Sequence, residues 1–148
     1  MRATVVEDAE VTTYVVVCDP GDEAVAVLAE FARSERLAAA QVTAIGAFRR
    51  AVVGWFDRDV KDYRRIPIDE QCEVLSLIGD IATGEKGSVL HLHAVLGLSD
   101  GTTRGGHLLE GHVWPTLEVV IREAPAQLRR VDRPDVGIAL IDVSRSQT

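Results

Sequence analysis

The four histidines of the chain lie close together in the sequence. They are His91, His93, His107 and His112, and the rest of the 148 residues contains none. Imidazole nitrogens are common ligands of zinc and of other transition metals. A metal site is therefore the first chemistry that this sequence indicates.

His91 and His93 alternate with apolar residues, in the run Val89-Leu90-His91-Leu92-His93-Ala94-Val95-Leu96. Successive side chains of a strand point to opposite faces, so the pattern predicts a strand with both imidazoles on one face and the apolar residues on the other. Two residues along a strand span about 6.6 Å between Cα atoms. Two histidines at that separation can converge on one cation.

His107 is the predicted third ligand. It follows a turn-forming stretch that ends in Gly105-Gly106, and glycine lets the backbone approach a site because it has no Cβ to clash. Three neutral imidazoles with one open position are typical of catalytic zinc, although nickel, cobalt or copper would also suit these ligands. His112 is not predicted to join, because on a strand without a bulge it faces away from His107.

Acidic residues near the histidines are candidates for orienting the imidazoles, namely Asp100, Glu110 and Glu118; metal-bound histidines usually need such partners. Asp100 precedes Gly101 in a turn and is interpreted as a solvated surface group. An alternative hypothesis has no metal, because strand histidines also pack at interfaces or hydrogen-bond to carboxylates. The histidines would then be structural residues of an oligomer.

Strands are expected to position these residues. Runs of β-branched and apolar residues predict two strands within 41–56, separated near Gly46 and Arg49-Arg50, and further strands at 11–18, 72–82, 88–98, 107–113, 117–122 and 137–143. Trp114-Pro115 is the predicted corner between two of them, and the charged segment 57–70 is predicted to be a solvated link.

One amphipathic helix is predicted from about Asp22 to Arg36, capped by Asp22 or by the residue before it. The connections between the strands are short, which favours a mainly antiparallel sheet of about seven strands with the helix packed on one face. We therefore expect a single α+β domain over residues 1–148.

Composition restricts the function classes. The chain has a mass of 16.1 kDa and a formal net charge of −7, which is the wrong sign for a protein that neutralises phosphates. Its two cysteines, Cys18 and Cys72, form no C-x-x-C pair and are expected to be reduced and buried. There is no signal-peptide pattern and no long apolar run. We expect a soluble, cytoplasmic protein without a membrane segment.

Several spaced motifs resemble the PPC family, whose domain is conserved in plants and prokaryotes, in its free-standing prokaryotic form. The resemblance covers nearly the whole chain. It rests on Gly46-Ala47-Phe48-Arg49-Arg50-Ala51, His91-Leu92-His93-Ala94-Val95-Leu96, Gly105-Gly106-His107-Leu108 and Pro115-Thr116-Leu117-Glu118-Val119-Val120-Ile121.

The resemblance implies an antiparallel sheet with a helix, and a homotrimer with the histidine strands near the subunit boundaries. It also implies that His91, His93 and His107 match the metal-binding histidines of prokaryotic relatives, where zinc is the usual ion. Arg49, with its neighbour Arg50, and Arg104 could hold a small anionic ligand near such a site. The plainer interpretation is that these arginines are exposed at strand ends and turns.

Plant members of this family carry an AT-hook, the short Arg-Gly-Arg-Pro element that enters the minor groove of DNA. This chain has no such element, and its Asp132-Arg133-Pro134-Asp135 places acids on both sides of the arginine. Direct DNA binding would therefore rest on family analogy alone. The leading hypothesis is a trimeric zinc protein that binds a ligand or hydrolyses one, with Glu110 or Glu118 as the nearest candidates for a base. Whether it is an enzyme stays open.

Overall fold

The computed structural model describes residues 1–8, 11–124 and 127–146. Within these residues there are one helix, a sheet of seven strands and a separate sheet of two strands. The predicted α+β fold with a mainly antiparallel sheet is confirmed. In chain order the elements are β1 Arg2–Asp8, β2 Thr12–Cys18, α1 Ala24–Ser34, β3 Ala39–Asp57, β4 Asp62–Ile68, β5 Cys72–Gly84, β6 Gly87–Gly97, β7 Thr103–Glu123, β8 Arg130–Arg133 and β9 Ile138–Ile141.

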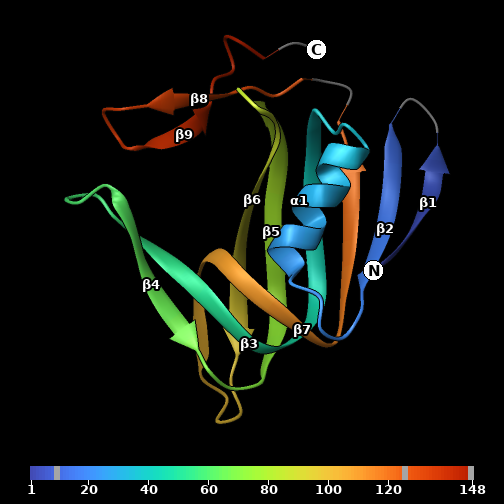
Figure 1. Cartoon of the computed structure of the whole chain (residues 1–148), viewed down its shortest axis with the longest axis vertical. Coiled ribbons are helices and arrows are strands. Elements are labelled where there is room, and N and C mark those ends of the chain that lie inside the picture. The colour runs from blue at the N-terminus through green and yellow to red at the C-terminus, as the bar shows by residue number, and fades with distance from the viewer. Residues whose placement is uncertain (9–10, 125–126, 147–148) are drawn as a thin grey trace.

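The large sheet has the strand order β1-β2-β7-β6-β5-β3-β4 (Figure 1). The beginning of β7 pairs with β6, while most of its length pairs with β3. Because β3 also pairs with β5, and β5 with β6, these four strands form a closed circuit. This curling brings the start of β7, which carries His107, beside the histidines of β6.

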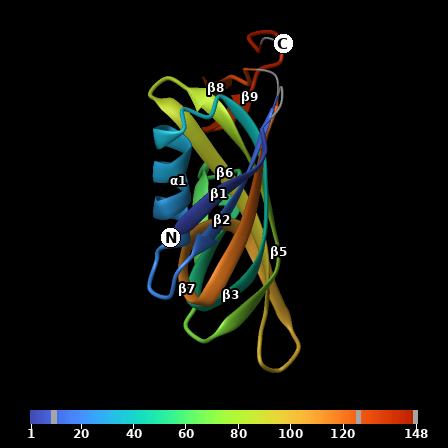
Figure 2. The same cartoon turned by 90° about the vertical axis from the view of Figure 1, so that its right-hand side faces the viewer.

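Helix α1 confirms the predicted helix, with slightly narrower bounds. It buries Ala24, Leu28, Phe31 and Ala32, and it covers one face of the sheet, with no described helix on the other (Figure 2). The predicted cap was wrong. The side chain of Glu23 accepts hydrogen bonds from two amides of the first turn, because the carboxylate of Asp22 is already used by the amide of Asp19 in the preceding turn.

Other sequence predictions change at the strands. The segment predicted as a solvated link contains β4, an edge strand that pairs with the end of β3. Of the seven residues of β4 only Ile68 is buried, so the polar composition of this strand resembles that of a loop. The two strands predicted within 41–56 are one strand, β3. Likewise 107–113 and 117–122 belong to the single strand β7, and Trp114-Pro115 lies within it as a cis peptide. Strand β1 was not predicted.

The predicted last strand is β9, but it pairs only with β8 and forms a hairpin outside the large sheet. This hairpin lies beside the end of the β5–β6 pair (Figure 1). The amide of Thr83 donates to the carbonyl of Leu128 at 2.7 Å, and Lys61 donates to the carbonyl of Pro134 at 3.1 Å. The hairpin is thus attached to the domain at both ends.

Cys18 and Cys72 are free and buried, as predicted. Burial raises the pKa of both thiols to about 11, so neither thiol is a reactive thiolate at neutral pH. No helix among the described residues is long and apolar enough to cross a membrane.

Candidate metal centre

Three histidines converge at the boundary between β6 and β7. His91 and His93 lie on β6, and His107 on β7 is the direct cross-strand partner of His93. Each ring offers one nitrogen, and these nitrogens all lie within 4.8 Å of one another. The sequence predicted this convergence, and the structure contains it.

The alternation along β6 explains why the rings meet. Leu92 and Ala94 are buried in the core, whereas His93 between them is exposed on the opposite face. His107 reaches the same place because glycine precedes it. A Cβ on Gly106 would lie 2.5 Å from the carbonyl oxygen of Gly54. Only glycine lets β7 pass this close to β3.

One pair of these nitrogens has the separation expected around a tetrahedral cation. Nε2 of His91 and Nε2 of His93 are 3.3 Å apart. Nitrogens bound at about 2.0–2.1 Å in tetrahedral geometry lie about 3.3–3.4 Å from each other, so the separation of this pair equals one edge of such a tetrahedron. Nδ1 of His107 is buried and has no hydrogen-bond partner among the described residues.

A carboxylate and an arginine stand behind His91. Asp80 on β5 is its cross-strand partner, and Nδ1 of His91 lies 3.7 Å from the Asp80 carboxylate. Arg130 on β8 donates to both Asp80 oxygens, at 2.9 and 3.0 Å. Its side chain is only 7% exposed. A partly buried ion pair therefore lies behind one of the three rings.

Neither member of this pair was among the predicted site residues. Asp80 had a usable signal, because the predicted strands 72–82 and 88–98 form a hairpin whose turn pairs Gly84 with Gly87. Counted four residues away from the turn along each strand, this register places Asp80 opposite His91. Arg130 had no comparable signal, since it is far away in the sequence and arrives through tertiary structure.

The electrostatics of the cluster favour neutral rings at His93 and His107. Burial, followed by the positive charges of His91, His93 and Arg130, lowers the pKa of His107 to about 4. Partial burial of its ring, followed by the charge of His91, also lowers the pKa of His93, although the residue as a whole is exposed. Burial opposes ionisation of Asp80, but its interactions with His91 and with the Arg130 guanidinium outweigh it and lower the pKa of that carboxyl. Neutral imidazole is the form that binds metals.

A cavity of about 180 Å³ opens beside two of the histidines. The ring of Tyr63 stacks on the ring of His107, with centroids 4.6 Å apart. Other walls are apolar and come partly from the β8–β9 hairpin, and they include Val89, Leu90, Ile138 and Leu140. Arg130 contributes the cationic group of the lining.

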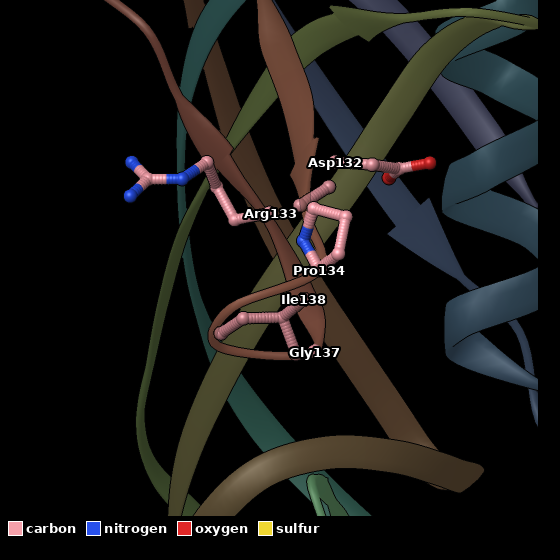
Figure 3. Close-up of a pocket in the computed structure, with 6 residues that line it drawn as sticks. Asp132, Arg133, Pro134, Gly137 and Ile138 are labelled. Carbon is pink, nitrogen blue, oxygen red and sulfur yellow. The ribbon is translucent and has the colours of Figure 1, made fainter.

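A second hollow, of about 350 Å³, lies on the hairpin itself. Asp132 and Arg133 point away from each other there (Figure 3), and Arg133 is paired with Asp135. This hollow gathers no set of groups that could do chemistry together.

Comparison with known proteins assigns the family. The model of the Plants and Prokaryotes Conserved (PCC) domain matches residues 6–125. The chain belongs to this family. A search of curated proteins gave no significant match.

Solved structures agree with membership of the PCC family. A plant- and prokaryote-conserved protein from Pyrococcus horikoshii is 27% identical with a TM-score of 0.83, over 95% of this chain and 94% of that one. A metal-containing protein from Archaeoglobus fulgidus is 31% identical with a TM-score of 0.80, over 87% and 91%. A protein from Bacteroides thetaiotaomicron, provisionally described as DNA-binding, is 26% identical with a TM-score of 0.88, over 97% and 99%. The PCC match ends before the β8–β9 hairpin, so Arg130 lies outside the matched region.

Other predicted site residues of this PCC domain have different surroundings. Glu110 forms an ion pair with Arg65, and Glu118 lines an apolar hollow with Ile45 and Leu75. Arg104 donates to the carbonyl of its neighbour, Thr103. None of these contacts involves the histidine cluster.

Three other residues considered in the sequence are Arg49, Asp100 and His112. Arg49 is exposed on β3. Asp100 accepts hydrogen bonds from Thr102 in an exposed turn, as predicted. His112 is not part of the cluster and lies 3.9 Å from the carboxylate of Glu110. The simple alternation used to exclude it does not hold, however, because β7 has a register shift between Leu108 and Glu110.

Proposed function

We propose that this PCC domain binds one zinc ion through His91, His93 and His107. The observation that carries the proposal is the convergence of three ring nitrogens to within 4.8 Å of one another, with one pair 3.3 Å apart. The lowered pKa values of His93 and His107 support it, since they keep both rings neutral. The relative from Archaeoglobus fulgidus, described as metal-containing, supports metal binding in general.

Residues around the ion would define what it does. Held by His91, His93 and His107, a zinc ion would supply Lewis-acid chemistry at this centre. Asp80 orients His91, and the stacked ring of Tyr63 fixes the plane of His107. The adjacent cavity combines apolar walls with Arg130, which suits a small organic anion. We propose ligand binding at this centre; hydrolysis is the further possibility that the open position supports.

We also propose that the domain assembles with copies of itself, as a trimer by analogy with the family. The face of the sheet opposite α1 exposes large apolar side chains: Ile45 is 61% exposed, Leu75 54% and Ile78 57%. These three residues line one shallow hollow. Ile78 is the direct cross-strand partner of His93, so the apolar surface continues to the histidines. Burying such a surface stabilises association.

Elemental analysis of protein purified without an affinity tag tests the zinc proposal. We expect about one zinc per chain, lost in a His93→Ala variant; His93 is exposed, so this variant should still fold. His112→Ala is the matched control, because it removes a histidine outside the cluster and should keep the metal. Full zinc occupancy in His93→Ala, or none in the native chain, contradicts the proposal.

DNA binding is the alternative, raised by the provisional description of the Bacteroides thetaiotaomicron structure. The formal charge of −7 opposes it. We expect no binding of duplex DNA in a mobility-shift titration, even at low salt. Binding with a steep salt dependence would favour the alternative.

A further inference from the structure

Arg130 contacts the histidine cluster directly. Its Nη2 atom lies 3.0 Å from Nδ1 of His91, in addition to its hydrogen bonds with Asp80. Its Nη1 atom donates to the carbonyl of Ala139 on the other strand of the hairpin. The arginine therefore joins the β8–β9 hairpin to one of the three candidate metal ligands.

The donor at this contact can be assigned from chemistry. A guanidinium has donors only, so Nδ1 of His91 must accept. A neutral imidazole has one protonated and one unprotonated nitrogen, which places the proton of His91 on Nε2. That N–H points toward Nε2 of His93, 3.3 Å away, which can accept it. Arginine, His91 and His93 thus form one hydrogen-bonded chain.

Zinc requires the opposite arrangement at His91. To bind through Nε2, the ring must present a lone pair there and carry its proton on Nδ1. That proton would face an N–H of Arg130, so the two groups could not keep their 3.0 Å contact. The carboxylate of Asp80, 3.7 Å from the same nitrogen, is the acceptor at hand.

We propose that Arg130 opposes metal loading by holding His91 in the tautomer that cannot bind the ion. This inference rests on the proposed zinc site. Loading moves the arginine off Nδ1, and Asp80 accepts the ring N–H in its place. The proton count balances, because the ring loses one proton from Nε2 to water and takes one from water at Nδ1. Arg130 comes from the hairpin, so metal occupancy and hairpin position are coupled.

A merely supporting arginine would act in the opposite direction. If Arg130 served only to orient Asp80 behind His91, its removal would loosen that carboxylate and weaken zinc binding. If it competes for Nδ1, its removal frees Asp80 to accept from His91 and also removes a positive charge beside the dication. Weaker binding by the variant would therefore indicate the supporting role. Tighter binding, together with an Nε2–H tautomer of His91 in the metal-free protein, indicates the competing role.

The first arm of the test needs no variant. Long-range ¹H–¹⁵N correlation spectra of the metal-free protein report which ring nitrogen of His91 carries the proton. We expect Nε2–H before zinc is added and Nδ1–H afterwards. Finding Nδ1–H in the metal-free protein overturns the inference whether or not the domain binds zinc, so this result is distinguishable from failure of the zinc site itself.

The second arm measures zinc affinity by competition with a chelator. We expect Arg130→Gln to bind zinc more tightly than the native chain, because the variant lacks the guanidinium that contacts Nδ1 of His91 and its positive charge beside the dication. Arg133→Gln is the matched control, because it removes the same charge from the same hairpin at an exposed pair with Asp135 and should leave the affinity unchanged. Unchanged or weaker binding by Arg130→Gln overturns the inference while leaving the zinc site intact. A native chain that binds no zinc overturns both.

Discussion

Gly106 offers a direct test of how the fold positions His107. An alanine Cβ at this position would lie 2.5 Å from the carbonyl oxygen of Gly54, and Cβ atoms essentially never approach another atom more closely than 3.0 Å. The residue also has a φ of +158°. Gly101 also has a positive φ, +82°, but a Cβ there would meet nothing within 4 Å. The pair of variants Gly106→Ala and Gly101→Ala therefore separates the clash from the backbone strain.

The expected magnitudes follow from these distances. Both variants carry the strain of a positive φ, about 1–2 kcal/mol. Gly106→Ala adds overpacking of about 1–3 kcal/mol, because backbone atoms of β3 must move. We expect Gly106→Ala to lower the free energy of unfolding by about 2–5 kcal/mol and Gly101→Ala by about 1–2 kcal/mol. Urea unfolding of the metal-free protein at one fixed chain concentration measures both.

Zinc affinity of the same two variants completes the test. Moving β7 away from β3 would displace His107 from the other two rings, so Gly106→Ala should also bind zinc more weakly. Gly101→Ala, at the turn before β7, should bind it normally. Equal losses of stability in the two variants, with equal zinc affinities, would refute the argument that close strand approach positions His107.

His107, Ile78 and Glu23 each allow one further test. Burial and neighbouring charge lower the pKa of His107 from 6.5 to about 4, so between these pH values the folded state binds fewer protons than the unfolded state. The free energy of unfolding of the metal-free protein should therefore fall as the pH drops from 6.5 to 4. His107→Gln should flatten this pH dependence, and an unchanged slope in that variant would contradict the prediction. Ile78→Asp should shift sedimentation toward the monomer while the exposed Val60→Asp does not; an unaltered assembly would contradict the proposed interface. Glu23→Ala removes the acceptor for the amides of Val25, Ala26 and Gly111. It should lower the free energy of unfolding, measured by thermal denaturation, by about 1–2 kcal/mol. No change in that free energy would contradict the role of Glu23 as the cap.

The sequence could predict the part of the site that lies on one strand. The alternation around His91 and His93 determines the face of both rings, and it holds because β6 has no register shift along this stretch. The double glycine before His107 correctly indicated a close backbone approach. Both inferences depend only on local geometry, which is why they survive in the structure.

Features that depend on distant partners could not be predicted in this way. Strand β4 is an edge strand with mostly exposed residues, so its composition resembles a loop and only its pairing with β3 reveals it. Arg130 acts on His91 from a hairpin that pairs with itself and attaches to the domain by tertiary contacts. Glu110 and Glu118 are close to His107 in sequence, but they contact Arg65 and the apolar hollow instead, because the long strand β7 carries them away.

The central claim is that one chain holds a cation between three named rings. Anomalous diffraction at the zinc edge, from crystals of protein purified without a tag, tests it most directly. We expect one peak per chain, about 2.0–2.1 Å from a nitrogen of each of His91, His93 and His107. A chain that contains zinc but shows its peak elsewhere, or none between these rings, would contradict the account.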